Sequence, residues 1–275
     1  VLDPLFIFVL DMGVRGAAIA TVLSQLLSAL WVLRFLTGPK AELRLHFRGF
    51  RPDFSCIRKI AVLGISSFVM SFTDSLVQVA SNATLRMFGG DIYVSVMTVI
   101  NSVRQIAQTP VMAITDGASP AISYNYGAAV YGRVCAAIRF MTQLSFGYTL
   151  LIWALISAFP AAFIMIFNHD AELVAATVPA LHIYFFGFVM MAFQFSGQCV
   201  FKSLNKARLA VFFSLLRKAF IVVPLTLLLP HIGGLGVNGV FLAEPVSNLV
   251  GGLACYITMR LTVMPELKRL PSQNT

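Results

Sequence analysis

Polar side chains recur at helical spacing inside an otherwise apolar stretch, residues 59–87. At intervals of three or four positions they form one stripe along a helix: Ser67, Ser71, Asp74, Gln78 and Asn82. A carboxylate in such a stripe can take up a proton or a cation, and the neighbouring amides can ligate an ion or a polar solute. The stripe therefore indicates binding chemistry rather than bond-breaking chemistry.

The next apolar stretch, residues 91–119, carries a second polar set: Asn101, Arg104, Gln105, Gln108, Thr115 and Asp116. If both stretches are membrane helices that meet one interface near residues 87–91, Asp74 and Arg104 lie at similar depth, roughly 20 Å in at 1.5 Å per residue. A charge at the bilayer centre costs about 2.5–3.5 kcal/mol, so such residues pair or face a cavity. Two interpretations stay open: an Asp74–Arg104 ion pair that fastens the helices, and a role of Asp74 in coupling or substrate binding.

Three further ionisable residues stand in apolar stretches near the end of the chain. Glu244 precedes Pro245, which removes a backbone donor, so free carbonyl groups could lie beside the carboxylate. A position of Glu244 at the outer interface is the other interpretation. Arg217 and Lys218 lie about ten residues into their stretch, and their long side chains are expected to reach the cytoplasmic surface.

Motifs for other chemistry are weak. Residues 234–239 match G-x-G-x-x-G, but they fall between two predicted membrane helices instead of between a strand and a helix. The sequence contains no Walker motif, no His pair at metal-ligand spacing and no framework among its four Cys residues. We expect no catalytic residues, no metal site, no enzyme activity and no cofactor beyond a coupling ion.

The elements that must position these residues are membrane helices. Of the 275 residues, 58% are hydrophobic and 11% charged, and the mean hydropathy is +0.84, whereas soluble domains carry about 25% charged residues. A helix needs about 20 apolar residues to cross a bilayer. We predict an all-α polytopic membrane protein with spans at about 14–37, 59–87, 91–119, 137–162, 175–200, 207–230 and 235–260.

Lys and Arg residues alternate between the predicted loops. Residues 34–59, 133–139, 202–208 and the tail from Arg260 are basic, whereas the opposite loops contain Arg15 and Arg86. The positive-inside rule then places the basic loops and the C-terminus in the cytoplasm. We predict a multi-pass protein of the bacterial cytoplasmic (inner) membrane. Its net charge of +9 reflects these loops and their contact with lipid, not nucleic-acid binding.

One motif occurs twice. The pattern G-V-x-G-x-x-[IL]-A-x-x-[VL]-S-[QN] covers residues 13–25 and 236–248, an offset of 223 positions from Gly13 to Gly236. Such a repeat indicates an internal duplication, which is common in secondary transporters. The chain would then hold the end of a first repeat and all of a second, with roughly 170–190 residues of the first repeat expected upstream.

A second distinctive run ends the predicted helix 91–119. It reads Thr109-Pro110, then Asp116-Gly117-Ala118-Ser119-Pro120, then Ser123-Tyr124-Asn125-Tyr126-Gly127-Ala128. Two prolines ten positions apart predict a bent or interrupted helix. With the repeated motif, this run resembles the multidrug and toxic compound extrusion (MATE) family. Phe193-Gln194, residues 204–208 and Arg217 are also similar to that family, and the resemblance covers essentially the whole chain, from the family's fifth helix through its twelfth.

The resemblance implies two six-helix lobes that face each other across a central cavity in the inner membrane. Residues 1–37 would end the N-terminal lobe, 38–58 form a cytoplasmic inter-lobe linker, 59–262 form the second, C-terminal six-helix lobe, and 263–275 form a cytoplasmic tail. It also implies a secondary active antiporter that exports cationic or amphiphilic drugs and toxic compounds in exchange for H⁺ or Na⁺ by alternating access. Its partners would be these small molecules, membrane lipids and the missing N-terminal lobe.

The same resemblance places a coupling acid at Asp74. The family's usual Pro in that helix is replaced by Ser66, and residues 175–200 contain no Asp or Glu to complete a sodium site. Candidates for the substrate or ion cavity are Gln78, Asn82, Asn101, Arg104, Gln108, Met112 and Gln194. Because Met adapts its shape and aromatic faces attract cations, flat apolar cations would suit a wall formed by Met70, Phe72, Met97, Met112, Met190, Met191 and Phe195.

Two alternatives stay open. A flippase for lipid-linked saccharides would share the two-lobe plan, but its cavity should be cationic to hold phosphate, and in the sequence only Arg104 clearly qualifies. A non-transporting truncated remnant is the other alternative, and the upstream sequence would distinguish it from a transporter.

Overall fold

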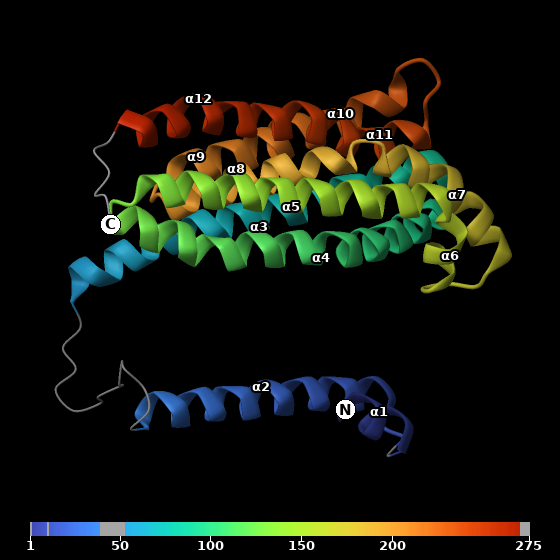
Figure 1. Ribbon diagram of the computed structural model, residues 1–275. Coiled ribbons are helices and arrows are strands. Elements are labelled where there is room, and N and C mark those ends of the chain that lie inside the picture. Colours follow the sequence, from blue (N-terminus) through green and yellow to red (C-terminus); the bar gives the residue numbers. More distant parts are fainter. Residues whose placement is uncertain (1, 10, 39–52, 270–275) are drawn as a thin grey trace. The chain divides into compact units, whose positions relative to one another are not determined.

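The computed structural model describes residues 2–9, 11–38 and 53–269, and these are helical almost throughout (Figure 1). The predicted all-α fold is confirmed. Contacts divide the chain into two units, Val1–Lys59 and Ile60–Thr275. Most of the predicted linker 38–58 and residues 270–275 of the predicted tail lie outside the described residues, so the domain boundaries stay a prediction.

The first unit contains the first copy of the repeated motif. A short helix, α1 (Leu2–Pro4), continues as the π-helical segment η1 (Leu5–Val9), and the long helix α2 (Gly13–Thr37) follows. Gly16 of α2 packs so closely on this segment that an added Cβ would lie 2.7 Å from the carbonyl oxygen of Phe6. A side chain at position 16 is therefore excluded.

The second copy of the motif repeats this contact. An added Cβ on Gly239 would lie 2.7 Å from the backbone of Leu229 and Pro230, and the offset of 223 maps Gly16 onto Gly239 and Phe6 onto Leu229. The first glycine of each copy has a left-handed backbone, with φ of 51° at Gly13 and 50° at Gly236. The glycines recur because both copies need the same tight turn and the same close helix contact.

The second unit is built mainly from six long helical segments, counted over the described residues. Two of them are broken by wide π-helical turns, and one is bent. Their parts are α3 (Phe54–Gly89, which begins in the first unit), α4 (Asp91–Gly127), α5 (Tyr131–Ala158), α7 (Ala171–Phe185) with η2 (Phe188–Met190) and α8 (Met191–Ser203), α9 (Ala207–Leu215) with η3 (Leu216–Val222), α10 (Val223–Leu228) and η4 (Leu229–His231), and α11 (Val237–Ser247) with η5 (Asn248–Gly252) and α12 (Leu253–Arg269). A short helix, α6 (Pro160–Met165), connects α5 to α7.

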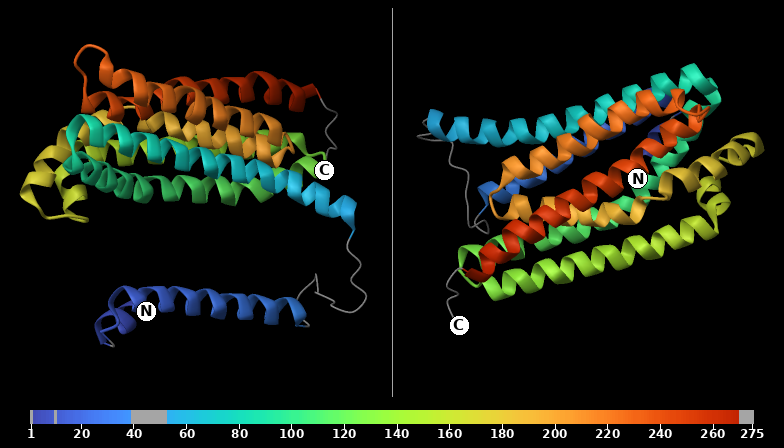
Figure 2. Two further views of the ribbon diagram at one scale, coloured as in Figure 1. Left: turned by 180° about the vertical axis from the view of Figure 1, so that it is seen from behind. Right: turned by 90° about the horizontal axis from the view of Figure 1, so that it is seen from above.

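These helices run alongside one another (Figure 2). α4 packs on α5, α7 and α8, and α8 packs in turn on α5 and α12. α3 meets the α10–α11 region at its end, where the Phe88 ring lies edge-on to His231 at 5.0 Å between ring centroids. Gly89 leaves no room for a Cβ there, since Val237 would lie 2.6 Å away.

Two apolar clusters occupy opposite ends of this unit. On α4, residues 96–107 belong to the first cluster and Ile122 to the second; on α11–α12, residues 240–241 belong to the first and 255–267 to the second. Buried polar residues fall between the clusters along the same helices. This polar middle layer contains Ser145, Thr149, Gln194, Ser196, Arg217, Glu244, Ser247 and Asn248.

The described helices include several that can cross a membrane by length and composition. They are Gly13–Thr37, Tyr131–Ala158, Arg208–His231 and Val237–Arg269, with Ala171–Phe185 and Phe188–Ser203 as a fifth, bent span. α4 is 37 residues long, and the polar residues predicted to face a cavity lower its hydropathy. The protein is an integral, multi-pass membrane protein.

Helix continuity differs from the expectations at two places. α4 is not interrupted between Asp91 and Gly127 although it contains Pro110 and Pro120, because neighbouring helices can compensate for the lost backbone bonds; a bend at these prolines stays a prediction. The predicted span 175–200 is not one helix. It bends by 45° between Phe185 and Phe188, where Gly187 packs against the backbone of Pro245.

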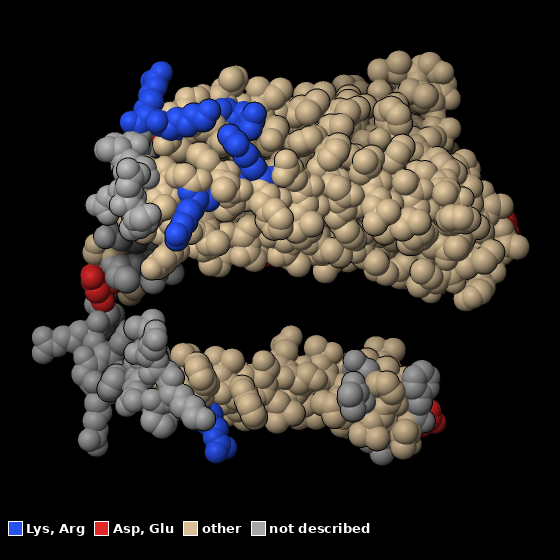
Figure 3. Space-filling view, in the orientation of Figure 1, with Lys and Arg blue, Asp and Glu red and all other residues tan. Residues whose placement is uncertain are grey.

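Most basic residues of the second unit outside the cavity lie at one end, and Arg86 lies at the other. On the face shown in Figure 3, Lys and Arg side chains lie toward the end of this unit where α12 finishes. The α4–α5 and α8–α9 connections, at residues 128–130 and 204–206, lie at that same end. The arrangement agrees with the alternation of charge along the sequence, and the cytoplasmic assignment of this end stays a prediction.

Candidate functional site

A cavity of about 290 Å³ opens among the helices of the second unit, beside the polar middle layer. α3 and α4 provide one wall, and α7, α8, η3, α10 and α11 provide the remainder. Five charged residues line it: Asp74, Arg104, Arg217, Lys218 and Glu244. The two helices that carry the polar stripes in the sequence therefore do face one cavity.

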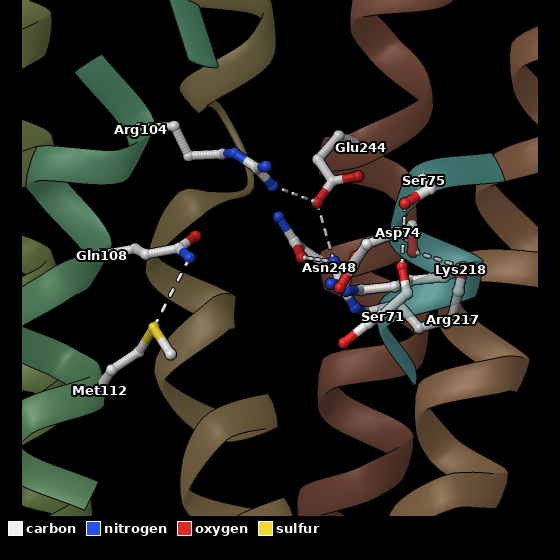
Figure 4. A network of polar contacts seen from close by, with 11 residues as sticks. Ser71, Asp74, Ser75, Arg104, Gln108, Met112, Arg217, Lys218, Glu244 and Asn248 are labelled. Atoms are coloured by element: carbon white, nitrogen blue, oxygen red, sulfur yellow. Dashed lines mark hydrogen bonds and ion pairs between the residues drawn. The ribbon is translucent and has the colours of Figure 1, made fainter. Parts of the chain in front are cut away.

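Glu244 is the centre of the charged network (Figure 4). Its Oε1 atom accepts a hydrogen bond from Nη1 of Arg217 at 2.9 Å and lies 3.5 Å from Nη1 of Arg104. The same Arg217 nitrogen also donates to Oδ1 of Asn248 at 2.7 Å. The side chains of Glu244 and Arg217 are only 11% and 8% exposed, so both are enclosed within the helix bundle. The expectation that Arg217 reaches the cytoplasmic surface was wrong.

Two π-helical segments bring Arg217 to Glu244. Arg217 lies in η3, and its carbonyl oxygen accepts a hydrogen bond from Oγ of Ser247 at 3.0 Å. Gly251 in η5 packs on the Arg217 side chain, since an added Cβ would lie 2.9 Å from its Cγ. A π turn shifts the helix register and is often found at functional sites. Here it directs a guanidinium into the bundle.

Asp74 pairs with Lys218 and not with Arg104. Of the two interpretations that the sequence left open, the Asp74–Arg104 ion pair is therefore wrong, because η3 inserts Lys218 beside α3 while Arg104 turns toward Glu244 (Figure 4). The Asp74 side chain is 56% exposed in this chain and that of Lys218 is 18% exposed. Lys218 thus extends into the cavity and not toward the cytoplasmic surface.

The amide side chains line the cavity as the stripes predict. Gln78, Asn82, Asn101 and Gln108 all belong to its wall. The first three make no side-chain hydrogen bond to another described residue, while Nε2 of Gln108 lies 3.7 Å from the Met112 sulfur. Unpartnered amides in a cavity wall are available to an ion or a solute.

Two of the predicted cavity residues, Met112 and Gln194, lie elsewhere. Met112 is one turn beyond Gln108 and does not line this cavity. Gln194 is 3% exposed and packs within the bundle, where neither its Oε1 nor its Nε2 has a partner among the described residues. Its Cβ lies close to Gly252 of η5, and Gln194 does not line the cavity.

The apolar part of the wall agrees partly with the sequence analysis. Met97, Met191 and Phe195 line the cavity, whereas Phe72 and Met190 do not. Ser66, Ser67 and Met70 lie outside the described side chains. The Tyr184 ring completes this part of the wall.

Three residues that line the cavity were not among the site residues predicted from the sequence: Arg217, Lys218 and Glu244. The sequence did indicate a role for them, because ionisable residues inside apolar stretches are costly unless they pair or face a cavity. Their pairing partners could not be predicted, because the π turns that bring these residues together do not follow from helical periodicity. Among the described residues, no group of three His, Cys, Asp or Glu side chains could hold a metal ion.

Comparison with known proteins decides the family. The MatE family model matches residues 66–228, more than half of the chain. The chain belongs to the MatE family. The matched segment runs from α3 through α10 and contains nearly all of the cavity wall, so the resemblance found in the sequence is confirmed.

Relatives of this MatE-family chain are multidrug exporters by name. The multidrug export protein MepA of Staphylococcus aureus (strain MSSA476) is 24% identical over 267 residues, which is 96% of this chain and 58% of that protein. MepA of Staphylococcus haemolyticus (strain JCSC1435) is 25% identical over 126 residues, 46% of this chain and 28% of that protein. The chain thus spans little more than half the length of the curated relatives that it matches.

Solved structures show the same fold. An outward-facing multidrug resistance MATE family transporter of the MOP superfamily superposes with a TM-score of 0.87 at 21% identity, over 98% of this chain and 60% of that one. A MATE crystal structure in complex with MaL6 gives 0.88 at the same identity and coverage. At this identity the likeness concerns the fold, and the chemistry of the cavity has to be argued from the residues of this chain.

Proposed function

We propose that this chain is the C-terminal portion of a secondary active efflux transporter, an antiporter that exports drugs and toxic compounds in exchange for H⁺ or Na⁺ by alternating access. The observation that carries the proposal is the cavity midway along membrane helices, lined by two carboxylates that each pair with a cation. Membership of the MatE family and the names of its relatives support export.

Asp74 is the proposed coupling residue. It is the more exposed of the two cavity carboxylates, so a proton or Na⁺ can reach it without displacing a buried network. Binding of either ion would weaken the attraction to Lys218 and leave that ammonium without its counter-charge. Because an unpaired charge in the membrane is costly, ion binding would favour a different arrangement of α3 against η3.

The family resemblance implies two substrate classes, cationic and amphiphilic compounds. The wall contains both apolar side chains, such as Met97, Met191 and Phe195, and free amides, which suits an amphiphilic molecule. A cation would meet Arg104, Arg217 and Lys218 in the same space. Amphiphilic compounds are therefore the class that this cavity supports better.

A flippase for lipid-linked saccharides is the second candidate function. In the sequence only Arg104 supported it, but Arg217 and Lys218 also line the cavity. Three cations could hold a phosphate group, as this function requires.

Transport by the full-length protein in sealed vesicles tests the proposal. With an imposed H⁺ or Na⁺ gradient, we expect accumulation of a fluorescent amphiphile that stops when an ionophore collapses the gradient. Vesicles containing this 275-residue chain alone are the control and should show no accumulation, since one lobe cannot enclose a solute pathway. Transport that continues without any gradient would overturn the antiport mechanism, and movement of a lipid-linked saccharide alone would favour the flippase.

A further inference from the structure

The charged residues of the cavity do not balance. Three cations, Arg104, Arg217 and Lys218, stand against two carboxylates, Asp74 and Glu244. We propose that this cavity binds the anionic group of an amphiphilic solute (a carboxylate, sulfonate or phosphate) with Arg104 as its main donor. The proposal rests on the proposed function in taking the cavity as part of a solute pathway, and it names the substrate class.

Both carboxylates of the cavity already form ion pairs with cations of the chain. Asp74 forms its ion pair with Lys218, and Glu244 accepts the 2.9 Å hydrogen bond from Arg217, which is also held by Asn248. A cationic solute would have to separate one of these pairs. An anionic solute needs no such separation, because a positive charge remains after both pairs have formed.

That remaining charge belongs to Arg104. Its nearest carboxylate oxygen, Oε1 of Glu244, is 3.5 Å from Nη1 and is already bonded more closely to Arg217. The Nε atom of Arg104 is buried and has no hydrogen-bond partner among the described residues. Its side chain is 31% exposed and lines the cavity.

A guanidinium with free donors is built to receive an oxyanion. Arg carries five N–H donors in a planar fork that matches a carboxylate or phosphate through two parallel hydrogen bonds. Among the described residues, Arg104 shares its only nearby carboxylate, Glu244, with Arg217. Because a positive charge that is not fully compensated is costly inside a membrane bundle, an anion that neutralises Arg104 gains more here than it would in water. Arg217 adds a second buried and unpartnered Nε beside the same cavity.

The other residues of the cavity wall indicate the chemistry of the part of the solute that does not carry the anionic group. Met191, Phe195, Val222 and Val240 form an apolar surface, and Gln105 joins the free amides of α3 and α4. A volume of about 290 Å³ is at the lower end of small-molecule pockets, which hold about 300–1,000 Å³. This lobe therefore accommodates a headgroup with part of an apolar body.

Two matched probes test the inference. In nanodiscs of zwitterionic lipid, the full-length protein is titrated with dansylglycine, a carboxylate, and with a dansylaminoethyl trimethylammonium of similar size. We expect the carboxylate to bind at least about tenfold more tightly. Arg104→Gln should remove that preference and leave the ammonium unchanged or tighter, whereas Arg104→Lys should retain part of it. Arg86→Gln is the matched control, because Arg86 forms an exposed pair with Asp91 outside this cavity.

The outcomes separate this inference from the proposed function. Tighter binding of the ammonium, or dansylglycine binding that Arg104→Gln leaves unchanged, overturns the anion site even if gradient-driven efflux is observed. Arg104-dependent dansylglycine binding without efflux supports the site and overturns the proposed function. Adding anionic lipid to the nanodiscs identifies the source of the anion: Arg104-dependent displacement of the probe by a few per cent of this lipid indicates a headgroup, and its absence indicates a free solute.

Discussion

The role of each charged side chain in this protein depends on its partner. Glu244 is shared by two guanidiniums, one at 2.9 Å and one at 3.5 Å, while Asp74 has a lysine as its partner. The two carboxylates also differ in burial, because the Glu244 side chain is almost enclosed and that of Asp74 is half exposed. Substitution of the two acids should therefore have different consequences, Glu244 mainly for stability and Asp74 mainly for coupling.

Replacement of Asp74 by Asn should impair coupling. Asn keeps the size and the hydrogen-bonding capacity of Asp but cannot titrate, so in the full-length protein we expect gradient-driven efflux to fall at least about fivefold while substrate binding changes little. Efflux and binding are measured on Asp74→Asn, Lys218→Gln and the double variant. If the double variant regains normal efflux, Asp74 is a structural partner of Lys218 and the coupling assignment is wrong. Asp91→Asn, in the exposed pair with Arg86, is the matched control.

Replacement of Glu244 by Gln should lower stability more than replacement of Asp74. Removing one partner of a buried pair costs about 3–5 kcal/mol, because the other charge is left buried without compensation. The Asp74–Lys218 pair is half exposed on the Asp74 side, so solvent screens it and its loss should cost less. Thermal unfolding of the purified protein in detergent provides the comparison. Equal unfolding temperatures for Glu244→Gln and Asp74→Asn would contradict the central position of Glu244 in the network.

The helices position these residues through local departures from regular α-geometry. η3 and η5 lie against each other where Gly251 meets Arg217, and the 45° bend between α7 and α8 lies where Gly187 meets Pro245. At both places a glycine permits two backbones or a backbone and a side chain to approach closely. The polar middle layer thus depends on small residues as much as on charged ones.

Replacement of Gly187 by Ala tests this dependence. Its backbone, with φ of −96°, accommodates Ala, so any effect comes from packing: the new Cβ would lie 2.5 Å from the carbonyl oxygen of Pro245. We expect a loss of about 1–3 kcal/mol, typical of overpacking, seen as a lower unfolding temperature. Gly147→Ala in α5 is the control, since nothing lies within 4 Å of its added Cβ, and it should gain up to about 1 kcal/mol. Equal behaviour of the two variants would show that the junction between α7 and η2 is not packed against α11 as described.

At the scale of the whole molecule, the distribution of Lys and Arg residues predicts how the protein is oriented in the membrane. The connections at one end of the second unit are basic and those at the other end are nearly free of Lys and Arg, which predicts that the first end lies in the cytoplasm. This assignment includes residues 38–58, 127–136 and the tail after Arg260. The opposite end includes the connection from α6 to α7.

Labelling of single cysteines tests the orientation. A membrane-impermeant thiol reagent added outside intact cells should modify cysteines placed at positions 168–172 and spare those placed at 129–130, in the connection between α4 and α5. Positions 129–130 and 168–170 lie between helices and positions 171–172 lie in the first turn of α7, so the two sets differ mainly in the end of the unit at which they occur. The reverse labelling pattern would mean that the positive-inside rule has been misapplied to this chain.

The sequence by itself determined the class of the protein, its helices to within a few residues for α2 and α3, the repeated motif and the family. Hydropathy and the spacing of residues along one helix carry this information, and neither depends on what packs against that helix. The same local reasoning identified Asp74, Gln78, Asn82, Asn101, Arg104 and Gln108 as residues of a polar face, and all six line the cavity.

Only the tertiary structure decided which charges meet. Asp74 finds Lys218, and Glu244 finds Arg217 and Arg104, because the π turns of η3 and η5 rotate side chains by an amount that ideal helical periodicity does not predict. For the same reason Gln194 lies in the packed interior and not in the cavity wall. Pairing between distant residues depends on how whole helices pack, and that packing also determined that the cavity carries an excess of positive charge.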